Sequence, residues 1–348
     1  MIRRASSGPR DVRRARASWL GLVALAAACG SRTGLDLGAG VGPSQPAQGF
    51  DAGCPQAPWL LFDVMEHEGP IYLRIYATHA DGTGGHFVIL PHDHAAFPSV
   101  SPDGTKLLYA TALPPDAGGG PDVDSALYVY DFASHSDSLV VTTSQLTYSA
   151  LSPDGRFVSY VSGYTLRAIG SDGSNDHALL SGPSDQGSGY GHPTFAADSR
   201  TVLYGTGGEV GAIEVDGSGD RNLLDAIPGS FQYPNPAFSP DYQRIVVGAF
   251  CSQTSPYALR IYAYSSLPGT TCDSGQLLVD VNDGASFNLA NDPSWGPDGR
   301  IAYASGKDVW IIEATGGTPT SLTAALTADG GTVQAADPVW VPGCADVP

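Results

Sequence analysis

The stretch FPSVSPDGTKLLYAT, residues 97–111, shows how this chain folds. Its centre, Ser101-Pro102-Asp103-Gly104, has the composition of a tight turn, because Pro presets φ at the second position and Gly tolerates a positive φ at the fourth. The flanking residues are apolar and strand-like, with alternating polarity. Alone, the stretch predicts only a β-hairpin, so its meaning depends on whether it recurs.

The same unit recurs along the chain. The further copies are YSALSPDGRFVSYVSG (148–163), HPTFAADSRTVLYGTGG (192–208), NPAFSPDYQRIVVGAF (235–250), DPSWGPDGRIAYASG (292–306) and a truncated DPVWVPG (337–343). The central Asp residues are Asp103, Asp154, Asp198, Asp241 and Asp298, at spacings of 51, 44, 43 and 57 residues. Further strands around a turn follow most copies, as in LRAIGSDGSNDHALL (166–180). Such periods, with four strands each, are typical of propeller blades.

A large apolar residue also repeats two positions after the Pro position of each copy, which is Ser149 in the second. The six residues are Val100, Leu151, Phe195, Phe238, Trp295 and Trp340. We expect each of them to pack between neighbouring blades.

The count of strands predicts how the ring closes. The last copy, at Pro338, has only an inner strand, whereas residues 58–64 and 71–90 supply three strands that lack an inner one. One C-terminal strand and three N-terminal strands would share a blade, which removes open sheet edges. The prediction for residues 54–348 is an all-β, six-bladed propeller of four-stranded antiparallel blades.

This repeat resembles that of the TolB-type six-bladed propeller, whose repeats carry a Pro-x-Trp-Ser-Pro-Asp-Gly signature followed by an apolar strand. The resemblance covers residues 58–343 and implies the propeller fold. It implies little about function, because many propellers with different roles share the repeat. Members of the TolB family carry a small domain before the propeller, whereas this chain has a Gly- and Pro-rich stretch there.

The N-terminus has the pattern of an export signal. Six Arg residues precede WLGLVALAAA (19–28), an apolar run too short to span a bilayer. The sequence LAAAC resembles a lipobox and predicts lipidation of Cys29, with an ordinary signal peptide and an incidental Cys as the alternative. Gly30 in place of Asp favours the periplasmic side of the outer membrane, with surface exposure as an alternative. Residues 1–28 are thus predicted to be a signal peptide and 29–53 a disordered tether.

The charge of the chain excludes one class of partner. The formal net charge is −18, and without residues 1–28 it becomes −23. Such a surface repels nucleic acid and anionic lipid headgroups. We therefore expect a monomer that reaches the membrane only through lipid on Cys29 and binds an envelope protein or peptide.

Four further cysteines suggest disulfides, because an even number in an exported chain is typical of them. Of the three pairings, the blade count favours Cys54–Cys344. This bond would link the two ends of the ring covalently. Elimination then pairs Cys251 with Cys272 in blade four, although a seven-residue strand would hold the two ends roughly 20 Å apart. The alternative is two free buried thiols.

Polar residues gather before the inner strands. They are His92, Asp93, His94, Tyr148, His192, Tyr233, Asn235, Asn291, Asp292 and Asp337. Because the connectors between blades reach the central channel, these residues predict a polar ring at one channel mouth. One interpretation is a metal or polar-ligand site, since imidazole with carboxylate suits zinc. The other is that Asn and Asp before Pro merely cap turns.

No catalytic motif accompanies this ring. The sequence contains no Gly-x-Ser-x-Gly elbow, no HExxH and no phosphate-binding loop ahead of a helix, and no cofactor is expected. The first hypothesis is therefore a non-enzymatic module that docks a protein or peptide. The alternative is a metal-assisted lyase or hydrolase acting on polysaccharide through His92, His94, His192 and nearby carboxylates. A purely structural envelope protein is a third hypothesis.

Overall fold

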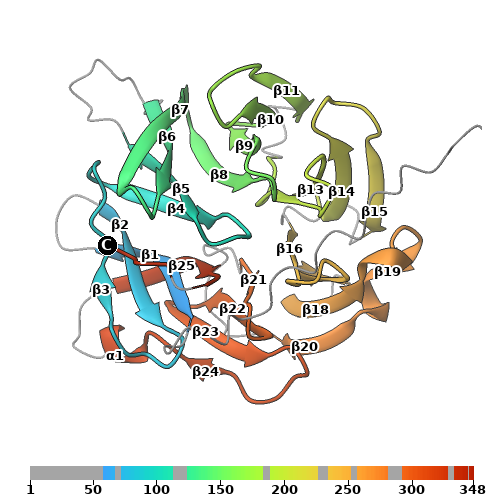
Figure 1. Ribbon diagram of the computed structural model, residues 1–348. Coiled ribbons are helices and arrows are strands. Elements are labelled where there is room, and N and C mark those ends of the chain that lie inside the picture. The colour runs from blue at the N-terminus through green and yellow to red at the C-terminus, as the bar shows by residue number, and fades with distance from the viewer. Residues whose placement is uncertain are drawn as a thin grey trace, which may run out of the picture. The chain divides into compact units, whose positions relative to one another are not determined.

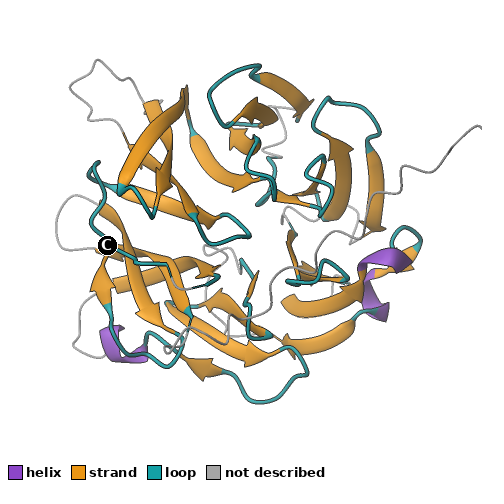
Figure 2. Ribbon diagram, in the orientation of Figure 1, coloured by secondary structure: helices purple, strands orange, loops and turns teal. Residues whose placement is uncertain are grey.

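The computed structural model describes residues 58–66, 72–112, 124–182, 189–225, 234–251, 257–280, 292–327, 333–343 and 345–348. All of them belong to one compact unit, Pro43–Pro348. They form six β-sheets arranged around a centre, with very little helix (Figures 1 and 2). No helix in these ranges is long and apolar enough to cross a membrane. The predicted signal peptide, the tether and Cys29 lie outside the described residues.

Each sheet is one blade, and the strands follow one another outward from the centre. The closing blade is β25 (Val333–Val341), β1 (Trp59–Glu66), β2 (Tyr72–His79) and β3 (His86–Phe87). Blade one is β4 (Ala95–Val100), β5 (Lys106–Ala112), β6 (Asp124–Asp131) and β7 (Ser136–Ser144), and blade two is β8 (Leu146–Leu151), β9 (Phe157–Ser162), β10 (Thr165–Gly170) and β11 (His177–Ser181). Blade three is β12 (Thr194–Phe195), β13 (Thr201–Thr206), β14 (Glu209–Glu214) and β15 (Arg221–Asp225).

Blade four is β16 (Asn235–Phe238), β17 (Arg244–Phe250), β18 (Tyr257–Ala263) and β20 (Gln276–Asp280), and blade five is β21 (Ser294–Trp295), β22 (Arg300–Ser305), β23 (Asp308–Glu313) and β24 (Thr320–Ser321). The helical segments are α1 (Ala324–Thr327) and two 3-10 turns, Tyr264–Ser266 and Cys272–Ser274. The predicted six-bladed, all-β architecture is confirmed.

The ring closes as predicted. The C-terminal strand β25 pairs antiparallel with the N-terminal strand β1, from Trp59 opposite Val341 to Glu66 opposite Val333. Figure 1 shows this contact as red beside blue. The closing blade therefore joins the two ends of the folded chain through main-chain hydrogen bonds, and β1 is paired along both edges, by β25 and β2.

The hydrophobic core is divided into six clusters, each between two neighbouring blades. Every cluster contains one of the repeated large residues, namely Val100, Leu151, Phe195, Phe238, Trp295 and Trp340, each in a different cluster. The prediction that they pack between blades is confirmed. Trp340 is the most tightly held by hydrogen bonding, because its indole N–H donates to the carbonyl of Ser294, 3.0 Å away.

The Pro-Asp turns are stabilised by their own aspartates. Each Asp accepts a hydrogen bond from the backbone N–H two residues later, as from Thr105 to Asp103 at 3.0 Å and from Arg156 to Asp154 at 3.1 Å. The same bond is present at Asp198, Asp241 and Asp298. Gly104 has φ +70°, and a Cβ there would lie 1.9 Å from the carbonyl oxygen of Pro342. The turn of blade one thus packs directly on the closing blade, which only Gly permits.

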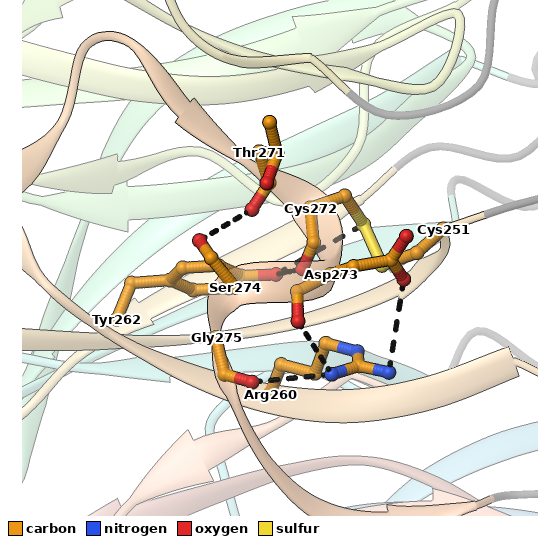
Figure 3. The surroundings of a disulfide bond; sticks show 8 residues. All are labelled: Cys251, Arg260, Tyr262, Thr271, Cys272, Asp273, Ser274 and Gly275. Atoms are coloured by element: carbon orange, nitrogen blue, oxygen red, sulfur yellow. Dashed lines mark hydrogen bonds and ion pairs between the residues drawn. A yellow bond between two sulfur atoms is a disulfide. The ribbon is translucent and has the colours of Figure 1, made fainter.

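Blade four departs from the simple four-stranded pattern. After β18 the chain turns outward, and β19 (Thr270–Thr271) pairs in parallel with β15, so that blade three gains a fifth strand. The first 3-10 turn precedes β19, and the second begins at Cys272, which forms a disulfide with Cys251 with the Cα atoms 5.3 Å apart (Figure 3). The predicted Cys251–Cys272 bond is confirmed, because this fold-back removes the expected separation. Cys54 and Cys344 lie outside the described residues, so their bond stays a prediction.

Candidate binding site at the channel mouth

A central channel with a cavity volume of about 210 Å³ is lined by the inner strands of all six blades. Each blade contributes the residue that precedes the shared proline, or Ser149 in blade two, and this residue lies inside the inner strand or within two residues of its start. These six residues are Phe97, Tyr148, His192, Asn235, Asp292 and Asp337. We call them the pre-proline ring. In blades one to five, the turn that carries the repeated Asp follows the inner strand.

Irregular strands place half of this ring. The strand register shifts at the ring position in β4, between Ala96 and Ser99, and in β8, between Leu146 and Ser149. The pairing of β1 with β25 shifts at the same level, next to Asp337. Phe97 and Asp337 have φ of 55° and 52°, a left-handed conformation that is costly for residues other than Gly. Bulges of this kind redirect side chains, here toward the channel.

One half of the ring is aromatic. The ring of Phe97 meets that of Tyr148 edge-on at a centroid distance of 6.0 Å. Tyr148 in turn lies against the imidazole of His192, with the ring centroids 3.8 Å apart. Aromatic contacts at these distances are attractive beyond the area they bury. This half therefore forms a rigid, largely apolar wall.

The other half is ionisable and closely connected. The Nε2 atom of His192 lies 3.2 Å from Asp337 Oδ1 and 3.6 Å from Asp292 Oδ2. The backbone N–H of His192 donates to Asn235 Oδ1 at 2.9 Å, and the side-chain amide of Asn235 donates to Asp292 Oδ1. Ligand atoms of His192, Asp292 and Asp337 all lie within 4.8 Å of one another.

Asp63, on the neighbouring strand β1, is a further member of this cluster. It is 1% exposed, its Oδ2 accepts the backbone N–H of Phe97 at 2.8 Å, and its carboxyl interacts electrostatically with Asp337. The sequence analysis missed this residue. Its signal is an acidic side chain inside the apolar strand segment WLLFDV (59–64), where a buried charge needs a partner.

Burial and mutual charge shift the pKa values of this cluster in opposite directions. Burial raises the pKa of Asp63 well above its ordinary value, and burial likewise raises that of Asp292. Burial alone would lower the pKa of His192, but Asp292 and Asp337 raise it. Burial also opposes ionisation of Asp337, yet hydrogen bonds from Asp292, His192 and Asp63 lower its pKa. Asp337 is therefore the carboxylate at the centre of the cluster and His192 its cation.

The structure brings Tyr148, His192, Asn235, Asp292 and Asp337 together, but not the two histidines predicted with them. His92 Nε2 lies 3.5 Å from Asp137, and its ring stacks on Tyr128 of β6, with the centroids 4.0 Å apart. His94 is exposed, with φ 58°. Neither belongs to the metal-range group found among the described residues. The reason is the bulge in β4, which makes Phe97 the ring residue of blade one.

Comparison with known proteins bears on the fold. No protein-family model and no curated protein matches the chain. Among solved structures, TolB from Acinetobacter baumannii matches with a TM-score of 0.61 and 15% identity, over 82% of this chain and 67% of that one. This protein is a TolB-like six-bladed propeller. At that identity the likeness concerns the fold alone, and the ring chemistry must be argued from this chain's own residues.

Two further solved structures match with lower TM-scores. A chain of a nidogen/laminin complex matches with a TM-score of 0.54 and 10% identity, over 81% of this chain and 98% of that one. An oligogalacturonate lyase in complex with manganese matches with a TM-score of 0.47 and 13% identity, over 67% and 68% of the two chains. A TM-score that low carries no conclusion about activity.

Proposed function

We propose that this TolB-like propeller is an exported, non-enzymatic binding module of the cell envelope, anchored by lipid on Cys29 at the periplasmic side of the outer membrane. The signal-like segment, the lipobox-like LAAAC and the tether support export and anchoring. The TolB-like fold supports an envelope setting. The occupant of its channel mouth is a segment of a partner protein or a peptide.

The observation that carries this proposal is the pre-proline ring. Its ionisable half, from His192 to Asp337, lines the channel cavity, and its aromatic half, Phe97 and Tyr148, packs beside His192. A docking segment can place an apolar side chain against Phe97 and Tyr148 while a donor group reaches Asp292 or Asp337. Rigid aromatic anchors beside charged groups are typical of binding hot spots. A match to a chain of a nidogen/laminin complex is compatible with such a role.

The test is affinity capture from envelope extract with residues 31–348, which contain the whole compact unit. A ring variant, Phe97→Ala with Tyr148→Ala, and a turn variant, Asp154→Ala, serve as parallel baits. We expect a specific protein on the wild-type and turn-variant baits that is lost from the ring variant. Capture that is equal on all three baits, or no specific capture, would contradict docking at this mouth.

A second candidate function is a metal-assisted lyase or hydrolase, favoured by the grouping of His192, Asp292 and Asp337 within 4.8 Å. His92 and His94 are not part of that group, so the candidate now rests on one histidine. Polysaccharides incubated with protein and Zn²⁺ or Mn²⁺ would reveal it. A lyase creates an ultraviolet-absorbing double bond, and a hydrolase creates new reducing ends. Product formation that disappears in His192→Ala would favour this candidate over docking.

A further inference from the structure

We infer that His192, Asp292 and Asp337 form a binding site for one divalent transition-metal ion, best matched by Zn²⁺, which opens into the central channel. One imidazole and two carboxylates supply the ligands. The site goes beyond the docking function, because it requires no partner protein and would exist whether or not one binds.

The spacing of the three ligand atoms fits such an ion. His192 Nε2 lies 3.2 Å from Asp337 Oδ1 and 3.6 Å from Asp292 Oδ2. Tetrahedral bonds of about 2.0–2.1 Å to nitrogen and oxygen place two ligand atoms roughly 3.3 Å apart. The atoms therefore stand near their coordinating positions, and small side-chain shifts would admit the ion.

Each ligand is already held by a neighbour, which is the usual arrangement around protein-bound metals. The amide of Asn235 donates to Asp292 Oδ1, and the same residue accepts the backbone N–H of His192. Tyr148 covers one face of the imidazole. Asp63, behind the ring, interacts electrostatically with Asp337.

One ligand atom has no hydrogen bond in this arrangement. Asp292 Oδ2 is buried and accepts none from any described residue, although Oδ1 of the same carboxylate does. A buried carboxylate oxygen left without a donor is costly and calls for an explanation. Asp292 Oδ2 lies 3.6 Å from His192 Nε2, and a metal ion bound between these two atoms would supply the missing interaction.

The local charges favour a cation. Within the described ranges, the only cationic side chain paired with Asp292 or Asp337 is His192. Once the ion replaces the proton of the His192 cation, two carboxylates with a neutral imidazole carry a charge that the divalent ion balances, and buried charges require such balance. A nitrogen ligand favours zinc and similar ions over Ca²⁺ and Mg²⁺, which prefer oxygen.

The remaining coordination positions face open space. All three ligands line the channel, whose volume of about 210 Å³ has room for several waters. Three protein ligands with an open position are the arrangement of zinc sites that bind an exchangeable water or an external group.

The experiment is a titration of metal-stripped protein, residues 31–348, with Zn²⁺, followed by calorimetry and elemental analysis. We expect one Zn²⁺ per chain. His192→Ala and Asp337→Asn should each weaken binding by at least about 100-fold, and Asn235→Ala by about 10- to 100-fold with the stoichiometry kept. His92→Ala is the matched control, because His92 faces only one carboxylate, Asp137, and should leave the affinity unchanged.

A readout on the wild-type protein avoids variants that fail to fold. X-ray absorption of the zinc-loaded chain should show one imidazole among nitrogen and oxygen ligands at about 2.0–2.1 Å. Failure to bind Zn²⁺, binding that His192→Ala leaves intact, or a shell without imidazole would each overturn the inference. Partner capture that persists after metal removal would leave the docking proposal standing while the metal result decides this one.

Discussion

At the scale of single residues, two recurring positions have separate roles: the Asp of the turn and the residue before the proline. The Asp of each Pro-Asp turn binds its own backbone, as Asp154 does with Arg156 at 3.1 Å. The residue before the proline lies ahead of this turn in the chain. Phe97 and Tyr148 also pack against the clusters between blades, whereas the other four line the channel, so the position can carry chemistry. Turn substitutions should therefore affect stability alone.

Asp154→Ala tests this division. Its carboxylate accepts hydrogen bonds from Ser152 Oγ at 2.8 Å and Arg156 N at 3.1 Å, so we expect a loss of about 1–2 kcal/mol in the free energy of unfolding. Urea denaturation measures the loss, and zinc titration should show unchanged affinity. A loss of zinc affinity in this variant would contradict the view that turn residues serve stability and ring residues serve binding.

The same residue predicts a pH effect. Burial raises the pKa of Asp154, but hydrogen bonds from Ser152 and Arg156 outweigh it and leave the pKa below the ordinary value. A carboxyl with a lowered folded-state pKa stabilises the fold above its ordinary pKa of about 3.9, and that stability is lost as the pH falls through the folded-state pKa. Asp154→Asn should thus be destabilising at pH 7 and nearly neutral near pH 2. Equal destabilisation at both pH values would be inconsistent with this account.

At the scale of elements, blade four shows how a local excursion changes its neighbour. The segment between β18 and β20 leaves the blade, adds β19 to the outer edge of β15, and returns to the disulfide. Figure 3 shows Arg260 holding the returning chain through the carbonyls of Asp273 and Gly275. The disulfide therefore stabilises the edge of blade three as well as blade four.

Cys272→Ala should destabilise the protein by up to about 3 kcal/mol, because the bond closes a 21-residue separation. Thermal unfolding measures the change, and hydrogen exchange should rise at Thr270 and Thr271, whose pairing with β15 depends on the fold-back. Ser274→Ala is the control, since it removes only an exposed hydrogen bond to Thr271. Unchanged exchange at β19 in the cysteine variant would refute the coupling.

At the scale of the whole molecule, stability comes from the six clusters between blades and from the strand pairing that closes the ring. No blade has a core of its own, because each sheet buries its faces against the two neighbours. The contact between blade five and the closing blade joins the chain's C-terminal strand to the rest of the ring. Trp340, 3% exposed, lies at its centre.

Trp340→Ala should cost about 3–5 kcal/mol, because it removes a large buried side chain from the closing contact. Trp310→Ala is the matched control: the same side chain lies half-buried beside the cluster of blades four and five, and its loss should cost distinctly less. Urea denaturation measures the free energy of unfolding of both variants. Equal losses of unfolding free energy would show that the position of Trp340 in the closing contact does not make it more important for stability than Trp310.

Much of the fold and part of the site can be predicted from the residues in order. Tyr148, His192, Asn235, Asp292 and Asp337 are predictable as ring residues because each precedes an inner strand. In blade one the same rule points to Phe97. The prediction instead named His94 and His92, which lie three and five residues earlier. The register shift between Ala96 and Ser99, which surrounds Phe97, depends on how β4 pairs with β5, and the order of residues does not reveal it.

Blade number, the position of each inner strand and the closure of the ring follow from the sequence, because turn chemistry and alternating polarity are local properties that repeat along the chain. The contacts of the site are not local. His192 meets Asp337 across 145 residues, Asp63 reaches the ring from a different strand, and Cys272 returns to Cys251 only through an outward excursion. These contacts arise when six blades pack around one axis, because packing brings distant strand ends to a common point.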